Sequence, residues 1–294
     1  MNENLPATEA VNAATRGLDE LSTDALVRLL AREQHTALDA LDAAAPQLSR
    51  AVDAIVERLQ HGGTLHYVGA GTSGRLGVLD AAECPPTFGT LPELVCAHVA
   101  GGASALVGAV EGAEDDAAAG EAEAHALIRP GDAVVGISAS GGAAYVVAWI
   151  VAARACGALT IALTSDGDSA LAKAAELTIE LPTGAEPLAG STRMVAGTAQ
   201  KIALNTLSTV SMVRLGKVYD NLMVDVVATN AKLRARALRL IATLAHADEE
   251  RARELLEQAG GSVKIAVVMA RHRVDAAQAS LLLERERGFL RGLM

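Results

Sequence analysis

Apolar residues recur at helical spacing near the beginning of the chain. From about Thr23 to Leu59 they lie three or four positions apart, which predicts amphipathic helices with a break at Pro46. Beyond them the pattern changes to short apolar runs that end in turns rich in glycine or serine. These runs are Leu65–Val68, Leu94–Val99, Ala133–Ile137, Leu159–Leu163 and Leu177–Leu181.

Longer alanine-rich segments with helical periodicity separate these runs. Short aliphatic strands that alternate with helices are typical of βαβ units, in which helices cover both faces of a parallel sheet. The chain is therefore predicted to be an α/β protein. Ligands of such sheets bind at the carboxyl ends of the strands, so the turns after the strands are the first candidates for chemistry.

The last third of the chain returns to helical spacing. It predicts one helix over Thr198–Val213, a second from about Val224 to Leu244, and three short helices between Asp248 and Met294. Ser262 and Asp275 are expected to cap two of the short helices. We therefore expect N-terminal helices (1–60), a sheet domain (61–245) and a small C-terminal three-helix bundle (246–294).

Composition narrows the possible partners. Hydrophobic residues make up 51% of the chain but aromatic residues only 2%, so few side chains can stack on bases. A net charge of −10 also disfavours nucleic acid and anionic membranes. The uncharged stretch Ala133–Ala153 is long enough to span a bilayer, but the loop residues Ser138 to Gly142 at its centre would break a membrane helix. A small anion held by local geometry stays compatible with these features.

Cysteine usage and the N-terminal sequence indicate the compartment. Cys84, Cys96 and Cys156 form no CxxC pair and cannot all pair with one another, so no disulfide framework is expected. The first residues lack the basic and apolar segments of a signal peptide. A reducing cytoplasm is the expected location.

The first strand is followed by a turn that resembles a phosphate-binding loop. Gly69-Ala70-Gly71-Thr72-Ser73-Gly74 fits the GxGxxG pattern and opens a helix. A dinucleotide fold also needs an acidic residue at the end of the next strand, where this chain has Val99-Ala100-Gly101-Gly102. Hydroxyls beside free helix amides favour a phosphate monoester instead. A dinucleotide site and a plain tight turn are the alternatives.

Two further turns carry hydroxyl groups. Ser138-Ala139-Ser140-Gly141 ends the third strand, and Gly190-Ser191-Thr192-Arg193 precedes a helix. Each turn alone could be a helix N-cap, but three such turns together can converge on one anion. The predicted phosphate- and substrate-binding residues are Gly71, Thr72, Ser73, Gly74, Ser138, Ser140, Gly141, Ser191 and Thr192.

Two glutamates are candidates for acid–base catalysis. Glu83 lies near the end of the helix that follows the glycine-rich turn, since Pro85-Pro86 should stop that helix within one helical turn. Glu114 lies in an acidic run after the second strand. Both could instead be solvated surface residues. The histidines show no metal-binding spacing, and no GxSxG elbow is present, so neither a metal, a cofactor nor a covalent nucleophile is expected.

These motifs together resemble the N-acetylmuramic acid 6-phosphate etherase family, which has the sugar isomerase (SIS) fold. The resemblance rests on the run from Gly69 to Phe88, on Val110 to Asp115, on Gly190 to Arg193 with Gly197 to Lys201, and on Arg214 to Asp225. It covers nearly the whole chain. Three segments depart from the family pattern: Gly142-Ala143-Ala144 stands where Arg-Thr-Pro is usual, Val195 stands where a lysine is usual, and Asn12-Ala13-Ala14-Thr15 lacks the usual proline.

The resemblance implies cleavage of the D-lactyl ether of N-acetylmuramic acid 6-phosphate, with Glu83 and Glu114 as the two acidic catalytic residues. Our hypothesis is that Glu83 is the acid and Glu114 the base. It also implies a cytoplasmic homodimer with its site near the subunit interface, a small-molecule sugar phosphate as partner, and no cofactor. Two other functions fit the same fold: a non-catalytic sugar-phosphate sensor like the glucokinase regulatory protein, and an aldose–ketose isomerase.

Overall fold

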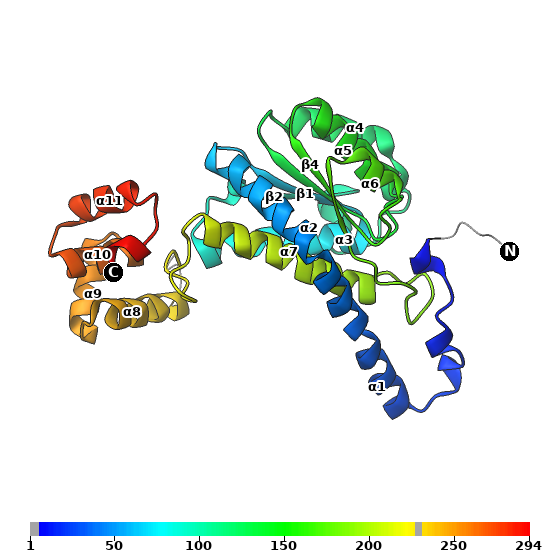
Figure 1. Cartoon of the computed structure of the whole chain (residues 1–294), viewed down its shortest axis with the longest axis horizontal. Helices are drawn as coiled ribbons and strands as arrows, with labels where there is room; N and C mark the ends of the chain where they lie inside the picture. Colours follow the sequence, from blue (N-terminus) through cyan, green and yellow to red (C-terminus); the bar gives the residue numbers. More distant parts are fainter. Residues whose placement is uncertain (1–5, 227–230) are drawn as a thin grey trace. The chain divides into compact units, whose positions relative to one another are not determined.

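The computed structural model describes residues 6–226 and 231–294 (Figure 1). Spatial contacts group the chain into two compact units. One unit contains the residues up to Ala81 together with Glu93–Leu207, and the other contains Ala82–Pro92 and Ser208–Met294. The division at residues 60 and 245 came from sequence pattern alone and stays a prediction.

The first unit is built on a sheet of five parallel strands in the order β2-β1-β3-β4-β5. The predicted α/β architecture is therefore confirmed, and each apolar run that predicts a strand overlaps one, although β1 and β4 each extend one residue further. The strands are β1 (Leu65–Gly69), β2 (Val95–Val99), β3 (Ala133–Ile137), β4 (Leu159–Thr164) and β5 (Leu177–Glu180).

Helices cover both faces of the sheet, as the alternation of side chains along β3 shows. Gly136 lies against Ile150 of α5, whereas Ile137, the next residue, lies close to Gly77 of α3 on the opposite face. The helices are α1 (Thr23–Glu33), α2 (His35–Gln60), α3 (Gly71–Phe88), α4 (Ala117–Leu127), α5 (Ala144–Ala155), α6 (Ala170–Ala174) and α7 (Val195–Arg214). Short 3₁₀ helices are η1 (Ala7–Glu9), η2 (Ala13–Thr15), η3 (Leu18–Glu20), η4 (Pro92–Leu94), η5 (Gly102–Leu106) and η6 (Ala113–Asp115).

The prediction of a helix break at Pro46 is wrong. Pro46 lies inside α2, and the chain divides instead at Gln34, between α1 and α2. Proline removes one helical N–H and leaves the carbonyl of Asp42 without its usual donor. Both residues are exposed, so water can solvate that carbonyl, and the buried stripe of α2 is continuous past this point. Pro85 and Pro86 are likewise accommodated in α3, which ends at Phe88.

The uncharged stretch Ala133–Ala153 is divided between β3, a loop and α5. Over the part of the chain that the structure describes, no helix combines the length and the apolar character needed to cross a bilayer.

The second unit contains the helices of the C-terminal part. They are α8 (Ala231–Ala245), α9 (Glu249–Gln258), α10 (Val263–His272) and α11 (Ala276–Arg285), followed by η7 (Arg291–Leu293). The predicted caps are confirmed: Ser262 Oγ accepts from Ile265 N, and Asp275 forms a capping box with Gln278. The predicted start of a helix at Val224 is wrong, because Val224 to Val226 are not helical. Residues 227–230 lie outside the described residues.

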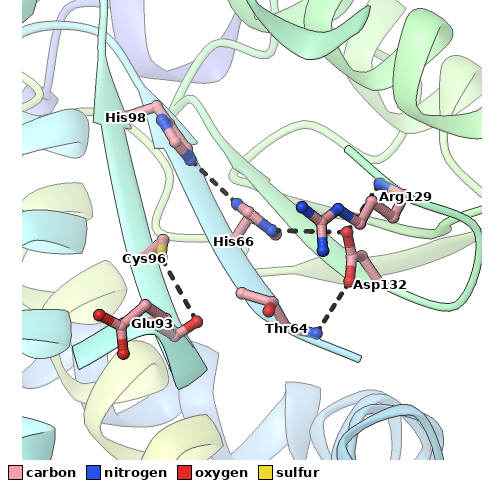
Figure 2. Close-up of polar contacts among 7 residues, drawn as sticks. All are labelled: Thr64, His66, Glu93, Cys96, His98, Arg129 and Asp132. Carbon is pink, nitrogen blue, oxygen red and sulfur yellow. Dashed lines mark hydrogen bonds and ion pairs between the residues drawn. The ribbon is translucent and has the colours of Figure 1, made fainter. Parts of the chain in front are cut away.

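Polar side chains on β1 and β2 form a cluster with Asp132 (Figure 2). His66 on β1 and His98 on β2 are stacked, and 3.0 Å separates His66 Nδ1 from His98 Nε2. Asp132 Oδ2 lies 3.7 Å from His66 Nε2, and the same carboxylate accepts hydrogen bonds from the backbone amides of Thr64 and Arg129. Asp132 therefore ties the beginning of β1 to the turn before β3.

The cluster continues into α4 and α5. His98 Nδ1 lies 3.3 Å from Glu123 Oε1, and the Tyr145 hydroxyl donates to the other oxygen of Glu123. The hydrogen bond from His98 lowers the pKa of Glu123, and burial raises the pKa of Tyr145. Burial also raises the pKa of the nearby Cys96 thiol, which keeps it protonated and unreactive.

Burial makes His66 a source of acid sensitivity. Loss of solvation, followed by the charge of His98, lowers the pKa of His66 to about 4 from 6.5, while Asp132 opposes the shift. Between these values the unfolded chain binds the proton and the folded chain does not. Stability is therefore complete above about pH 6.5 and falls as the pH drops towards 4, by about 3 kcal/mol for this group.

We expect His66→Gln to remove this part of the pH dependence. Urea unfolding of the unmodified protein and the variant at pH 7.5, 5.5 and 4.5 measures it: the stability difference between them should shrink or change sign as the pH falls. His35→Gln, at an exposed helix start, is the matched control and should keep the slope of the unmodified protein. Parallel pH profiles for the unmodified protein and His66→Gln would contradict the assignment.

Candidate active site

The site is built where three neighbouring strands end at one level. Gly69, the last residue of β1, is paired with Val99 of β2 and with Ile137 of β3. The segments that leave these strands therefore begin side by side at the carboxyl edge of the sheet. These are the predicted phosphate loop, the segment that contains Glu114, and the loop with Ser138 and Ser140.

The first turn brings the start of α3 very close to the end of β1. A side chain on Gly74 would lie 2.7 Å from the carbonyl oxygen of Gly69 and 2.7 Å from Val99 Cγ2, so this position has no space for a Cβ atom. The helix begins at Gly71 directly after the strand. The amides of its first residues have no partner within the helix, and the positive end of the helix dipole lies there. This is an anion-binding geometry.

The second turn keeps its hydroxyl protons available. Ser138 Oγ accepts from Gly141 N at 3.1 Å, and Ser140 Oγ accepts from Gly142 N at 3.3 Å. Each serine uses its oxygen as an acceptor, so its O–H can still donate to a ligand. Gly141 has φ +66 and its missing Cβ would lie 2.1 Å from Ser169 Oγ, which requires glycine there.

The third turn is fixed by a buried carboxylate that the sequence did not suggest. Glu186 is 1% exposed, and its oxygens accept from Val195 N and Ala196 N at 2.8 and 2.9 Å. This caps the start of α7 and holds the preceding turn, which carries Thr192. Val195, where the family usually has lysine, is buried and contributes only its amide to this cap.

The three turns line one pocket of about 380 Å³, which we call the phosphate pocket. It brings together seven of the predicted site residues: Gly71, Thr72, Ser73, Ser138, Ser140, Thr192 and Glu114. Gly74, Gly141 and Ser191 are absent from its lining; the two glycines support the turns by close packing. The binding roles of all of these residues stay predictions.

The groups of the phosphate pocket that could attract an anion are dipoles and not cationic side chains. Among the residues described, no lysine or arginine lines it; Gly142 and Ala143, where the family usually has arginine and threonine, lie on its wall. Arg193 and Lys201, the nearest cations in sequence to the third turn, are exposed. Hydroxyl and amide donors at a helix start must therefore supply the attraction for an anion.

A residue that sequence reasoning missed positions the first hydroxyl. Ser73 Oγ lies 2.8 Å from Gln200 Oε1, on α7, and Gln200 is 1% exposed with its Nε2 unpartnered. Amide oxygen and nitrogen are assigned from the hydrogen-bond network. The opposite assignment lets Nε2 donate to Ser73 Oγ, which leaves the serine proton free for a ligand. We prefer this assignment because it removes a buried unsatisfied donor.

The two predicted catalytic glutamates occupy different places. Glu114, in η6, is exposed and lines both the phosphate pocket and a neighbouring pocket. Glu83 is exposed on α3 and is not among the residues that line either pocket. Glu83 belongs to the second compact unit, whereas the residues that line both pockets belong to the first.

A parallel sheet with helices on both faces and hydroxyl-bearing turns at its carboxyl edge is consistent with the SIS class of α/β domains. Residues 47–154 match the glucokinase regulatory protein N-terminal SIS domain, and residues 114–209 match the SIS domain. The structure of a phosphoheptose isomerase from Francisella tularensis has a similar fold. Its TM-score is 0.50 at 18% sequence identity, and the match covers 66% of this chain and 99% of that chain.

Curated relatives then identify the family. An N-acetylmuramic acid 6-phosphate etherase from Symbiobacterium thermophilum is 50% identical over 268 residues, which is 91% of this chain and 89% of the relative. One from Deinococcus radiodurans is 50% identical over 288 residues, 98% of this chain and 94% of the relative. The chain belongs to the N-acetylmuramic acid 6-phosphate etherase family, as its motifs predict.

We expect Gln200→Met to weaken the binding of N-acetylglucosamine 6-phosphate roughly tenfold, because it removes one hydrogen bond that orients Ser73. Methionine has a similar length and adds no charge. Isothermal titration calorimetry measures the effect. Gln60→Met, at the exposed end of α2, is the matched control and should bind normally. An unchanged dissociation constant for Gln200→Met would show that Ser73 does not depend on Gln200.

Proposed function

We propose that this chain cleaves the D-lactyl ether of N-acetylmuramic acid 6-phosphate to give N-acetylglucosamine 6-phosphate and D-lactate. The observation that carries the proposal is the position of Glu114, a carboxylate at the edge of a pocket of hydroxyls and free helix amides. A phosphate held there leaves the carbon chain of an opened sugar beside a possible base. Full-length similarity to etherases supports the same substrate.

The reaction needs a base and an acid. In the open-chain aldehyde form of the sugar, the base removes the proton on C2, which is acidic because it lies next to the carbonyl group. The resulting enolate forms the C2–C3 double bond while the C3–O bond breaks, and the acid protonates the departing lactate oxygen. Water then adds at C3 and a proton returns to C2, which completes the 3-hydroxyl of the product.

We assign Glu114 as the base and Glu83 as the acid. Glu114 lines the pocket that would hold the sugar phosphate, which suits proton removal from C2. An ether oxygen is a poor leaving group, so a second carboxyl group must supply its proton. Glu83 lies in the segment that carries the strongest family resemblance.

The glucokinase regulatory protein match gives a second candidate, a sugar-phosphate sensor without catalysis. It covers residues 47–154, whereas the etherase relatives match nearly the whole chain. Tight binding of the substrate without release of D-lactate would favour the sensor. An aldose–ketose isomerase would share removal of the C2 proton but would release no lactate.

Solvent exchange at C2 separates the two glutamates. We expect Glu114→Gln to lose both C2 deuterium exchange and lactate release, and Glu83→Gln to lose lactate release while C2 exchange persists. Each loss should be on the order of 10²–10⁴ in rate. NMR in heavy water and a lactate assay measure them, with Glu121→Gln on the exposed face of α4 as the control. Exchange that survives in Glu114→Gln but not in Glu83→Gln would invert the roles.

We also propose a cytoplasmic homodimer in which Glu83 of one subunit completes the site of the other. The support is the resemblance to the etherase family, which implies a homodimer with its site near the subunit interface. A partner subunit could supply the missing acid. The cytoplasmic location stays a prediction from cysteine usage.

Mixing two inactive variants tests the shared site. Glu83→Gln and Glu114→Gln subunits, mixed and allowed to exchange, should regain about a quarter of the normal lactate release, because mixed dimers contain one intact site. Each variant exchanged with itself is the control and should stay inactive. Full exchange of subunits, verified by mass spectrometry, with no recovered activity would place both glutamates of a site in one subunit.

A further inference from the structure

A second pocket adjoins the phosphate pocket and shares Glu114 with it. It has a volume of about 270 Å³ and is formed by the start of α3 and the segment from Ala100 to Glu114. Ala70, Gly71 and Thr72 also line both pockets. A ligand atom beside Glu114 therefore has the phosphate pocket on one side and the second pocket on the other.

The lining of the second pocket is small and apolar except at four side chains. Alanine, glycine and a valine supply most of its wall, together with Thr72. Its charged side chains are Arg75, Glu111 and Glu114. Arg75 is thus the single cation among the described residues that line either pocket.

Arg75 is held in place without being neutralised. Its Nε donates to Ala105 O at 2.9 Å and to Leu106 O at 3.3 Å, and its Nη2 donates to Gly108 O at 2.9 Å. Within the described part of the chain, no carboxylate forms an ion pair with it. A guanidinium has five N–H donors, so the Nη1 hydrogens and one Nη2 hydrogen are left for a ligand.

We propose that the second pocket holds the lactyl arm of the substrate and that Arg75 binds its carboxylate; this rests on the proposed function. The substrate carries two anionic groups. The phosphate is accounted for by hydroxyls and amides, which leaves the carboxylate to pair with the one available guanidinium. With C2 beside Glu114, the group on C3 extends away from the phosphate and into the second pocket.

Arg75 would then distinguish the substrate from its sugar product. N-acetylglucosamine 6-phosphate has no lactyl group, so its affinity should not depend on the guanidinium. A substrate whose lactyl carboxylate is a methyl ester should also be indifferent to Arg75. Without the arginine, a free carboxylate would meet only Glu111 and Glu114, which repel it.

A cycle that changes the enzyme and the ligand separately tests this. Affinities are measured by calorimetry in the Glu114→Gln background, so that turnover does not interfere. We expect Arg75→Gln to weaken the binding of N-acetylmuramic acid 6-phosphate roughly 10- to 100-fold. The dissociation constants of the methyl ester and of N-acetylglucosamine 6-phosphate should change less than about twofold. Glu111→Gln is the matched control in the same pocket and should leave acid binding equal or tighter.

The outcomes separate this inference from the proposed function. Lactate release by the unmodified enzyme reports the function alone, whereas the acid-to-ester affinity ratio reports Arg75 alone. An equal loss of affinity for the substrate, its methyl ester and N-acetylglucosamine 6-phosphate would overturn the proposal. It would show that Arg75 only supports the loop from Ala105 to Gly108. If Arg75→Gln does not fold, Arg75→Lys tests the same proposal. It should lose less affinity, and only for the substrate with a free lactyl carboxylate.

Discussion

The function of this fold depends on three adjacent strands that end at the same level. Because Gly69 is paired with both Val99 and Ile137, the turns after β1, β2 and β3 leave the sheet within the spacing of neighbouring strands, about 5 Å. Each turn supplies a different part of the site: helix amides and hydroxyls, the Glu114 carboxylate, and two serines. A shift of register by one residue would move a turn by about 3.3 Å and separate these groups.

The two pockets offer different kinds of donor to an anion. In the phosphate pocket the donors are fixed by backbone geometry, and close packing of Gly69 against Gly74 keeps them in place. Among the residues described, no cation lines this pocket, so these dipoles must also outweigh the repulsion between a phosphate and the carboxylates of Glu114 and Asp115. The second pocket contains a guanidinium held by three carbonyls. A substrate with a phosphate at one end and a carboxylate at the other matches this difference.

The buried histidine cluster begins near the amino ends of the strands, with His66 and Asp132, and extends to His98, the fourth residue of β2. His66 is the second residue of β1 and Asp132 precedes β3, whereas the site begins after Gly69 and Ile137. Protonation of His66 therefore acts on the cohesion of the sheet and not directly on the ligand. The same sheet thus carries a buried polar network on β1 and β2 and has the proposed base, Glu114, beyond its carboxyl edge.

The strands, the N-caps of the C-terminal helices, the hydroxyl-bearing turns and the family could all be predicted from the sequence. Each of these follows from local spacing or from contiguous motifs. The missed helix through Pro46 shows the limit of local rules: the exposed side of α2 tolerates a lost hydrogen bond while its other side packs on the core. Only the tertiary structure paired Ser73 with Gln200, 127 residues apart, capped α7 with Glu186, and placed Arg75 beside Glu114. Such contacts depend on how strands order in the sheet, and spacing along a chain does not encode that order.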